Sequence, residues 1–122
     1  MANGDFTHIE IPADDPERAI RFYRDLFGWQ FEEATGFSGY HLFQTPGGEG
    51  ALAGAIGQRG VMAPPEIRVY VDVDSIDETL PRLAELGGSV VQPKAEITGQ
   101  GWFAVINDSE GNSIALFEGL PG

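Results

Sequence analysis

The chain has 122 residues, enough for one domain that buries a core without disulfides or a structural metal. It is 42% hydrophobic and 21% charged, and it has no cysteine, which excludes disulfides, thiolate metal sites and a cysteine nucleophile. Nineteen acidic against seven basic residues give a net charge of −12, which opposes binding to nucleic acid or anionic membranes. No apolar run is long enough to span a membrane, and the N-terminus lacks a signal-peptide pattern. We therefore expect a cytoplasmic protein that binds neither nucleic acid nor membranes.

The first predicted element is a strand with two different faces. Phe6, His8 and Glu10 alternate with Ile9 and Ile11, which is the period of a β-strand. We therefore expect His8 and Glu10 on one face of a sheet and the two isoleucines on the other.

A helix is predicted to follow over residues 15–27. Asp14 or Asp15 provides the N-cap, and Pro16 occupies the first helical position, where its missing amide hydrogen costs nothing. Apolar residues recur at spacings of three and four, so one side of the helix packs on the sheet. Gly28 provides the left-handed C-cap.

Three short strands are predicted next, over residues 29–34, 39–45 and 51–57, separated by glycine-rich turns. The third strand consists largely of alanine and glycine, so either an opposing helix or a ligand must fill the space beside it. Residues 58–65 form a connector whose prolines favour extended backbone.

The second half of the chain predicts the same succession of elements. A strand over 67–73 leads to Ser75 and Glu78, which form a capping box for a helix over 75–86. Pro81 lies too deep for a first-turn proline, so we expect the helix to bend there. Three further strands are predicted, over 89–98, 101–107 and 113–119.

The two halves repeat one pattern at an interval of sixty residues, which aligns His8 with Arg68 and Gly28 with Gly88. The order strand, helix and three strands occurs twice. This predicts an α+β fold of two βαβββ modules that form a curved mixed sheet with the helices on its outer face. We expect a single domain over 1–122, with one module over about 5–57, the connector over 58–65 and the second module over about 66–118.

Alternation places His8, Glu10, Arg68 and Tyr70 on the inner face of such a sheet. His8 titrates near neutrality and could act as an acid or base, with Glu10 orienting it, or could serve only as a hydrogen-bonded structural residue. Arg68 on an inner face needs an anionic partner, either Glu10 or the carboxylate or phosphate of a ligand. Trp102 could stack on a planar ligand if it faces inward.

Three segments, 7–29, 71–93 and 108–118, together resemble the vicinal oxygen chelate superfamily of glyoxalases, bleomycin-resistance proteins and extradiol dioxygenases. The resemblance covers essentially the whole chain. It implies paired βαβββ modules around a cavity and, in many members, a divalent metal held by four strand residues. Carried onto this chain, those positions fall on His8, near Gly54, at or beside Arg68 and near Ala115.

Of these four positions only His8 carries a side chain suited to metal binding. We therefore expect no cofactor, and a cavity whose ligand-binding residues are Arg68, Tyr70, Trp102, Gly54 and Ala115. The favoured function is metal-free binding of a small organic molecule. Two alternatives are a metal-free lyase or isomerase that uses His8 and Glu10, and a metal-dependent glyoxalase or dioxygenase.

We also expect a homodimer, because two modules alone would leave strand edges and apolar walls exposed.

Overall fold

The computed structural model describes residues 2–48 and 50–121. Its contacts divide the chain into two compact units. The first unit consists of residues 8–68, and the second of the residues from Val69 onward together with those that precede His8. Each unit corresponds to one copy of the predicted strand–helix–three-strand pattern.

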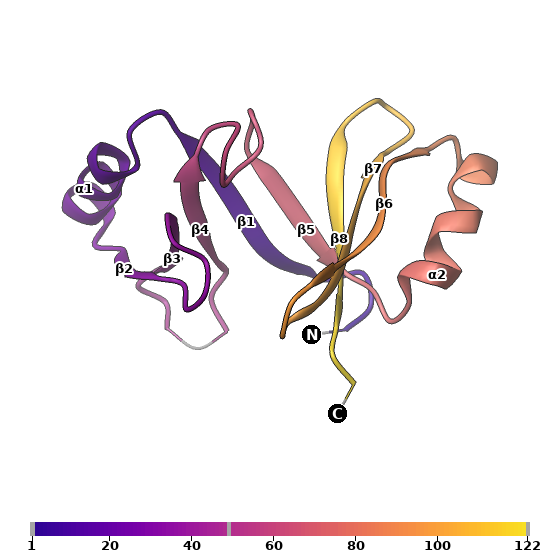
Figure 1. The fold of residues 1–122 in the computed structure, drawn as a ribbon, viewed down its shortest axis with the longest axis horizontal. Helices are drawn as coiled ribbons and strands as arrows, with labels where there is room; N and C mark the ends of the chain where they lie inside the picture. The colour runs from indigo at the N-terminus through magenta and orange to yellow at the C-terminus, as the bar shows by residue number, and fades with distance from the viewer. Residues whose placement is uncertain (1, 49, 122) are drawn as a thin grey trace. The chain divides into compact units, whose positions relative to one another are not determined.

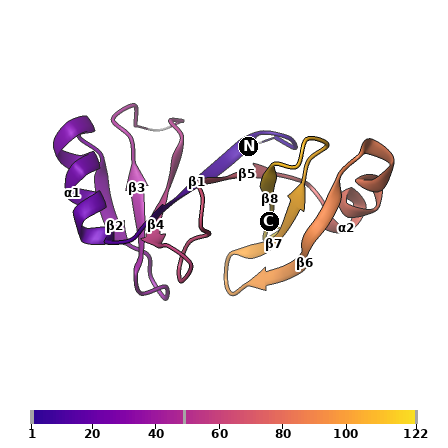
Figure 2. The ribbon, with the colours of Figure 1, turned by 90° about the horizontal axis from the view of Figure 1, so that it is seen from above.

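The first unit contains β1 (Phe6–Ala13) from His8 onward, α1 (Pro16–Phe27), β2 (Gln30–Glu33), β3 (Tyr40–Gln44) and β4 (Ala53–Gln58). The strands lie in the order β2-β3-β4-β1, with β4 parallel to β1 and the other pairs antiparallel. Figures 1 and 2 show α1 on one side of these strands.

Both ends of α1 follow from local sequence. The Asp15 carboxylate accepts a hydrogen bond from the amide of Arg18 at 3.2 Å, and Pro16 is the first helical residue. Gly28 ends the helix with a φ of 76°, and its amide donates to the carbonyl of Arg24. The predicted helix is confirmed.

Helix α1 packs on the sheet through a small apolar core. Its buried members are Ala13, Ile20, Phe43 and Ile56. Beside this core, the ring of Trp29 stacks on Phe43 with a centroid distance of 4.5 Å. One face of the first sheet is therefore fully occupied by helix and aromatic side chains.

The second unit contains β5 (Arg68–Asp72), α2 (Ile76–Thr79), β6 (Ser89–Ile97), β7 (Gly101–Asn107) and β8 (Ser113–Gly119). Arg68, the first residue of β5, belongs to the first unit by its contacts. The strand order is β5-β8-β7-β6, with β5 and β8 parallel and the remaining pairs antiparallel. The N-terminal residues Gly4 and Asp5 hydrogen-bond to the backbone of Asp72 at 2.7 and 2.8 Å.

The helix predicted over 75–86 is regular only over Ile76–Thr79. Two 3-10 turns, Leu80–Arg82 and Ala84–Leu86, complete the segment, and Gly87 ends it with a φ of 88°. The predicted bend at Pro81 therefore takes the form of a change of helix type. Proline lacks the amide hydrogen and its ring collides with the carbonyl four residues earlier, so the α-helical pattern cannot continue through it.

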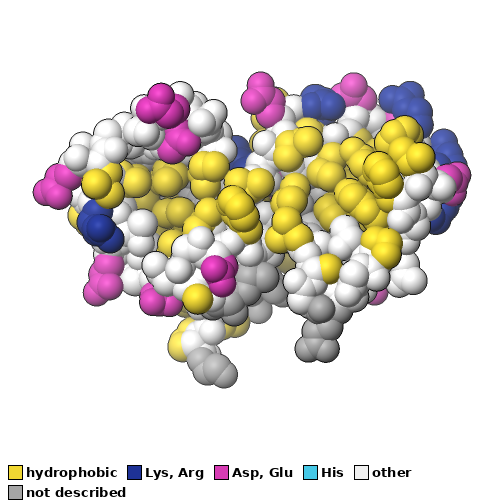
Figure 3. All heavy atoms as spheres, turned by 180° about the vertical axis from the view of Figure 1, so that it is seen from behind, with side chains coloured by type: hydrophobic (Ala, Val, Ile, Leu, Met, Phe, Trp, Pro, Cys, Tyr) yellow, Lys and Arg dark blue, Asp and Glu magenta, His cyan; other side chains and the backbone are white. Residues whose placement is uncertain are grey.

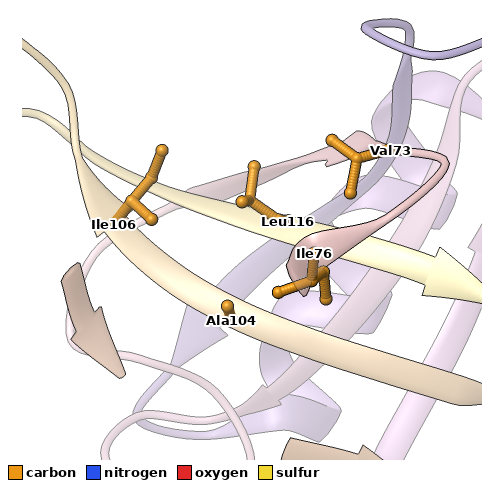
Figure 4. Close-up of a cluster of buried hydrophobic side chains, with 5 residues drawn as sticks. All are labelled: Val73, Ile76, Ala104, Ile106 and Leu116. Carbon is orange, nitrogen blue, oxygen red and sulfur yellow. The ribbon is translucent and has the colours of Figure 1, made fainter. Parts of the chain in front are cut away.

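The core of the second unit lies between α2 and its sheet. Figure 4 shows its five buried side chains, Val73, Ile76, Ala104, Ile106 and Leu116. Ile76 is fully buried. Each unit thus has a helix packed on one face of four strands, and the predicted α+β fold of two βαβββ modules is confirmed.

Within residues 2–48 and 50–121, no helix is both long enough and apolar enough to cross a lipid bilayer. Figure 3 shows hydrophobic side chains on the surface of both units. Exposed hydrophobic residues include Phe22, Leu26 and Phe27 of α1, each of which is more than half exposed.

Candidate functional site

Strand β1 places His8 and Glu10 on the face that α1 does not cover. Ile11, one residue further, packs against the core beneath α1, so the predicted alternation of this strand is confirmed. Glu10 is 7% exposed and is the one buried charged residue among those described. A buried carboxylate requires hydrogen-bond donors.

Tyr40 of β3 links the two side chains of β1. Its hydroxyl donates to Glu10 Oε2 at 2.7 Å and lies 2.8 Å from His8 Nε2. The His8 and Tyr40 rings are stacked, with an interplanar angle of 23° and centroids 6.2 Å apart. Two residues of β1 and one distant in the sequence thus form one hydrogen-bonded chain, His8–Tyr40–Glu10.

The proton positions in this chain follow from counting donors. A tyrosine hydroxyl has one hydrogen, and an ionised carboxylate can only accept. Since Tyr40 donates to Glu10, its oxygen accepts from His8, and the hydrogen of neutral His8 lies on Nε2. Tyr40 and Glu10 therefore determine the tautomer of His8.

Burial lowers the pKa of His8 below its ordinary value of 6.5, and the opposing attraction of the Glu10 carboxylate is smaller. His8 is consequently neutral at pH 7. A neutral imidazole can accept a proton, which is the state required of a general base.

A pocket of about 320 Å³ lies in the first unit, and His8 is part of its wall. Its lining residues come from β1, β2, β3 and β4: His8, Gln30, Phe31, Glu32, Leu42, Phe43, Gln44, Ala53 and Gly54. The volume is at the lower end of the range for small-molecule sites. Polar groups from His8, Gln30, Glu32 and Gln44 share the wall with apolar side chains.

Gly54 lines this pocket, but the packing of β4 on β1, and not the pocket, requires glycine at this position. A Cβ atom at this position would lie 1.9 Å from the carbonyl oxygen of Ile9 and 2.8 Å from the ring of Phe43. Glycine is thus needed for the close approach of β4 to β1. The space beside this strand, which the sequence assigned to either a helix or a ligand, is filled at Gly54 by Ile9 and Phe43.

Arg68 has none of the partners predicted for it within the described residues. Its Nε atom is buried and has no hydrogen-bond acceptor, and no carboxylate forms an ion pair with its guanidinium. Glu10 accepts from Tyr40 and does not pair with Arg68. The proposed Arg68–Glu10 ion pair is absent.

The remaining predicted ligand-binding residues belong to the sheet of the second unit. Tyr70 is buried and faces Ala115 across the β5–β8 pair, and Ala115 is completely buried. Trp102 packs against the core beneath α2, and the ammonium of Lys94 lies 4.9 Å from the centre of its ring. The inward orientation that would allow Trp102 to stack on a ligand is therefore not observed.

The family resemblance implies a divalent metal, and the side chains present do not fit one. Gly54, Arg68 and Ala115 provide no metal-binding atoms at the implied positions. Within the described part of the chain, no three His, Asp or Glu side chains converge on a common point. A zinc-type centre needs three or more such ligands.

The pocket contains residues that sequence reasoning did not select. Gln30 and Glu32 of β2 pair with Gln44 and Leu42 of β3, so these four side chains share one face. Alternation within each strand could have identified that face, but only the strand register shows that it adjoins His8. Tyr40 is a further residue of the site that sequence reasoning did not select, and it lies in the hydrogen-bonded chain.

Comparison with known proteins identifies the class of protein to which the chain belongs. The sequence profile of the glyoxalase/bleomycin resistance protein/dioxygenase superfamily matches residues 5–116. The chain belongs to this superfamily.

Individual relatives agree with this membership. A glyoxylase-like domain-containing protein of Didymella fabae is 30% identical over 124 residues, which cover 95% of this chain and 94% of the relative. Putative glyoxylase CFP32 of Mycobacterium bovis is 28% identical over 114 residues. That alignment covers 90% of this chain but 44% of the mycobacterial protein, so the chain spans less than half of its length.

A solved structure confirms the fold. Methylmalonyl-CoA epimerase from Mycobacterium tuberculosis superimposes with a TM-score of 0.64 at 22% identity, covering 97% of this chain and 89% of the epimerase. At this identity the likeness concerns the fold.

Proposed function

We propose that this protein binds a small organic molecule, without a metal ion, in the pocket of its first unit. The observation that carries the proposal is the pocket itself, whose wall combines His8 with the carboxamides of Gln30 and Gln44 and with apolar side chains. A concave site with a few convergent polar groups is the usual form of a small-molecule site. Among residues 2–48 and 50–121, no three side chains that could bind a metal ion lie together, which supports the metal-free part.

The lining chemistry limits the ligand. Leu42 offers an apolar side chain, and Gln30 and Gln44 offer both hydrogen-bond donors and acceptors. Glu32 provides a carboxylate. A ligand with an apolar body and one hydrogen-bonding end, small enough for a volume of about 320 Å³, matches this wall.

A thermal-shift screen of small organic molecules, followed by calorimetric titration of the hits, tests the proposal. Leu42→Trp should fill the pocket and abolish binding of every hit that occupies it. Val61→Trp is the matched control, because Val61 is 70% exposed and does not line the pocket. Hits that bind the Leu42→Trp variant as tightly as the wild type would refute the pocket. Elemental analysis showing a stoichiometric transition metal in purified protein would refute the metal-free part.

A second candidate function is that of a metal-free enzyme of the lyase or isomerase type. The observation that favours it is the His8–Tyr40–Glu10 chain, which presents a neutral imidazole of fixed tautomer at the pocket wall. In this scheme His8 accepts a proton from the ligand, and the nearby Glu10 carboxylate stabilises the imidazolium that forms. For any hit that the wild type converts, His8→Ala should retain binding and lose turnover. Unchanged turnover would exclude this function.

We also propose that the protein is a homodimer that resides in the cytoplasm. The exposed Phe22 and Leu26 lie one turn apart on α1, and apolar residues so arranged form a surface that soluble proteins tend to cover. Light scattering at micromolar concentration should give twice the mass of the chain. The double variant Phe22→Ser/Leu26→Ser should shift it toward the monomer, whereas a wild-type monomer would contradict the proposal.

A further inference from the structure

Among the basic residues that the structure describes, Arg68 alone has a buried nitrogen without a hydrogen-bond partner. Arg24, Arg59 and Lys94 form ion pairs with aspartates at 3.4, 2.8 and 3.0 Å. The three remaining arginines, Arg18, Arg21 and Arg82, are exposed, so water satisfies them. Arg68 is partly buried, and its Nε atom is fully buried without an acceptor.

The composition of the chain makes this observation informative. Nineteen acidic residues accompany seven basic ones, so carboxylates are abundant. Even so, none lies within ion-pair distance of Arg68 among the described residues. Buried donors in native proteins are almost always hydrogen-bonded, and each exception calls for an explanation such as strain, a functional role, or a bound water or ion.

We propose that Arg68 binds an oxyanion, a carboxylate or a phosphate group carried by a small molecule. The Nε–H and a neighbouring Nη–H point in parallel along one edge of the guanidinium, and this edge matches two oxygens of either group. The site goes beyond the proposed pocket, since Arg68 is not among the residues that line it.

The net charge of −12 sets the expected behaviour of this site. A strongly acidic protein repels free anions at long range, so attraction must come from direct contact with the guanidinium. Anion binding should therefore depend on the geometry of the anion: acetate and phosphate, which present two adjacent oxygens, should bind, whereas chloride at the same ionic strength should not.

The Nε–H group of Arg68 can report on binding directly, because arginine Nε–H pairs give resolvable signals in ¹H–¹⁵N NMR spectra. The Arg68→Lys variant identifies the signal by its disappearance. Sodium acetate and sodium phosphate are titrated separately into the wild-type protein, with sodium chloride at matched ionic strength as the reference. The expected result is a saturable shift of the Arg68 signal with acetate, phosphate or both, and none with chloride.

Matched variants separate this site from other effects. Arg68→Lys should weaken anion binding by roughly tenfold or more, because the bidentate edge of the guanidinium is lost. Binding to this variant is measured from the backbone amide signals near β5. Arg21→Lys, at an exposed position of α1, should leave it unchanged. Leu42→Trp should also leave it unchanged, so failure of the pocket and failure of the anion site are distinguishable.

Two results would overturn the inference. One is an Arg68 signal that does not move with either anion, and the other is a shift that chloride reproduces. The titration of the wild-type protein decides the matter alone if the lysine variant fails to fold, since the Arg68 signal can then be assigned from backbone connectivities.

Discussion

Tyr40 links the buried carboxylate of Glu10 to the imidazole of His8, which lines the pocket. Its hydroxyl satisfies the buried Glu10 and accepts from His8, so one oxygen atom serves both. A single atom thereby contacts both the buried carboxylate and the imidazole.

Tyr40→Phe should lower the free energy of unfolding by about 1–3 kcal/mol, because it removes a donor from a buried carboxylate. Urea denaturation measures this loss. Tyr23→Phe is the matched control, since its ring stacks on Trp29 and its hydroxyl has no hydrogen bond among the described residues. Equal losses in the two variants would show that the hydroxyl of Tyr40 has no special role.

The lowered pKa of His8 predicts a pH dependence of stability. In the unfolded chain His8 has a pKa near 6.5, whereas in the folded protein its pKa is lower. As the pH falls below 6.5, the unfolded chain therefore binds a proton before the folded protein does. Stability should therefore fall as the pH drops from about 6.5 toward the lowered pKa of His8, and stay level above 6.5 for this group. Denaturation across this range should show a smaller slope in His8→Gln than in the wild type. His41→Gln controls for the loss of a histidine and should retain the wild-type slope.

At the scale of the element, the approach of β4 to β1 depends on one glycine. Gly54→Ala should lower the free energy of unfolding by about 1–3 kcal/mol or more, since its Cβ would overlap the Ile9 carbonyl. Gly119→Ala, whose Cβ would lie an ordinary 3.5 Å from the Phe117 ring, should be nearly neutral. Thermal denaturation of the two variants measures the difference, and a neutral Gly54→Ala would contradict the described spacing.

Element types and order followed from the sequence because they depend on local signals. Asp15, Pro16 and Gly28 specify α1 through capping geometry that involves only neighbours in the chain. Pro81 predicted an irregular helix. That the irregularity consists of two 3-10 turns and not of a bend depends on packing, which no local pattern shows.

The site was less predictable because it depends on register between strands. His8 and Glu10 were identified by alternation within β1. Tyr40 reaches them from β3, two strands away in the sheet, and the sequence does not state which residue of β3 lies opposite them. For Trp102 the sequence left the orientation open, and the structure shows the side chain packed against the core beneath α2.

For the whole molecule, the excess of acidic residues should make stability depend on salt. Net charge of this size destabilises the compact state by repulsion, and the screening length falls to about 10 Å at 0.1 M salt. Raising sodium chloride from low concentration should increase the melting temperature by a few degrees. The double variant Glu85→Gln/Glu96→Gln, at two exposed positions, should respond less. A melting temperature that is insensitive to salt would show that the charges do not oppose folding.

The division of the chain into units also has a consequence for synthesis on the ribosome. The first unit is one continuous stretch, 8–68, and every residue that lines its pocket precedes β5 in the chain. The second unit joins residues from both ends, because Gly4 and Asp5 hydrogen-bond to Asp72. Since domains tend to form from the N-terminus as the chain emerges, the complete pocket wall leaves the ribosome first. The hydrogen bonds of Gly4 and Asp5 to Asp72 can form only after Asp72 has emerged.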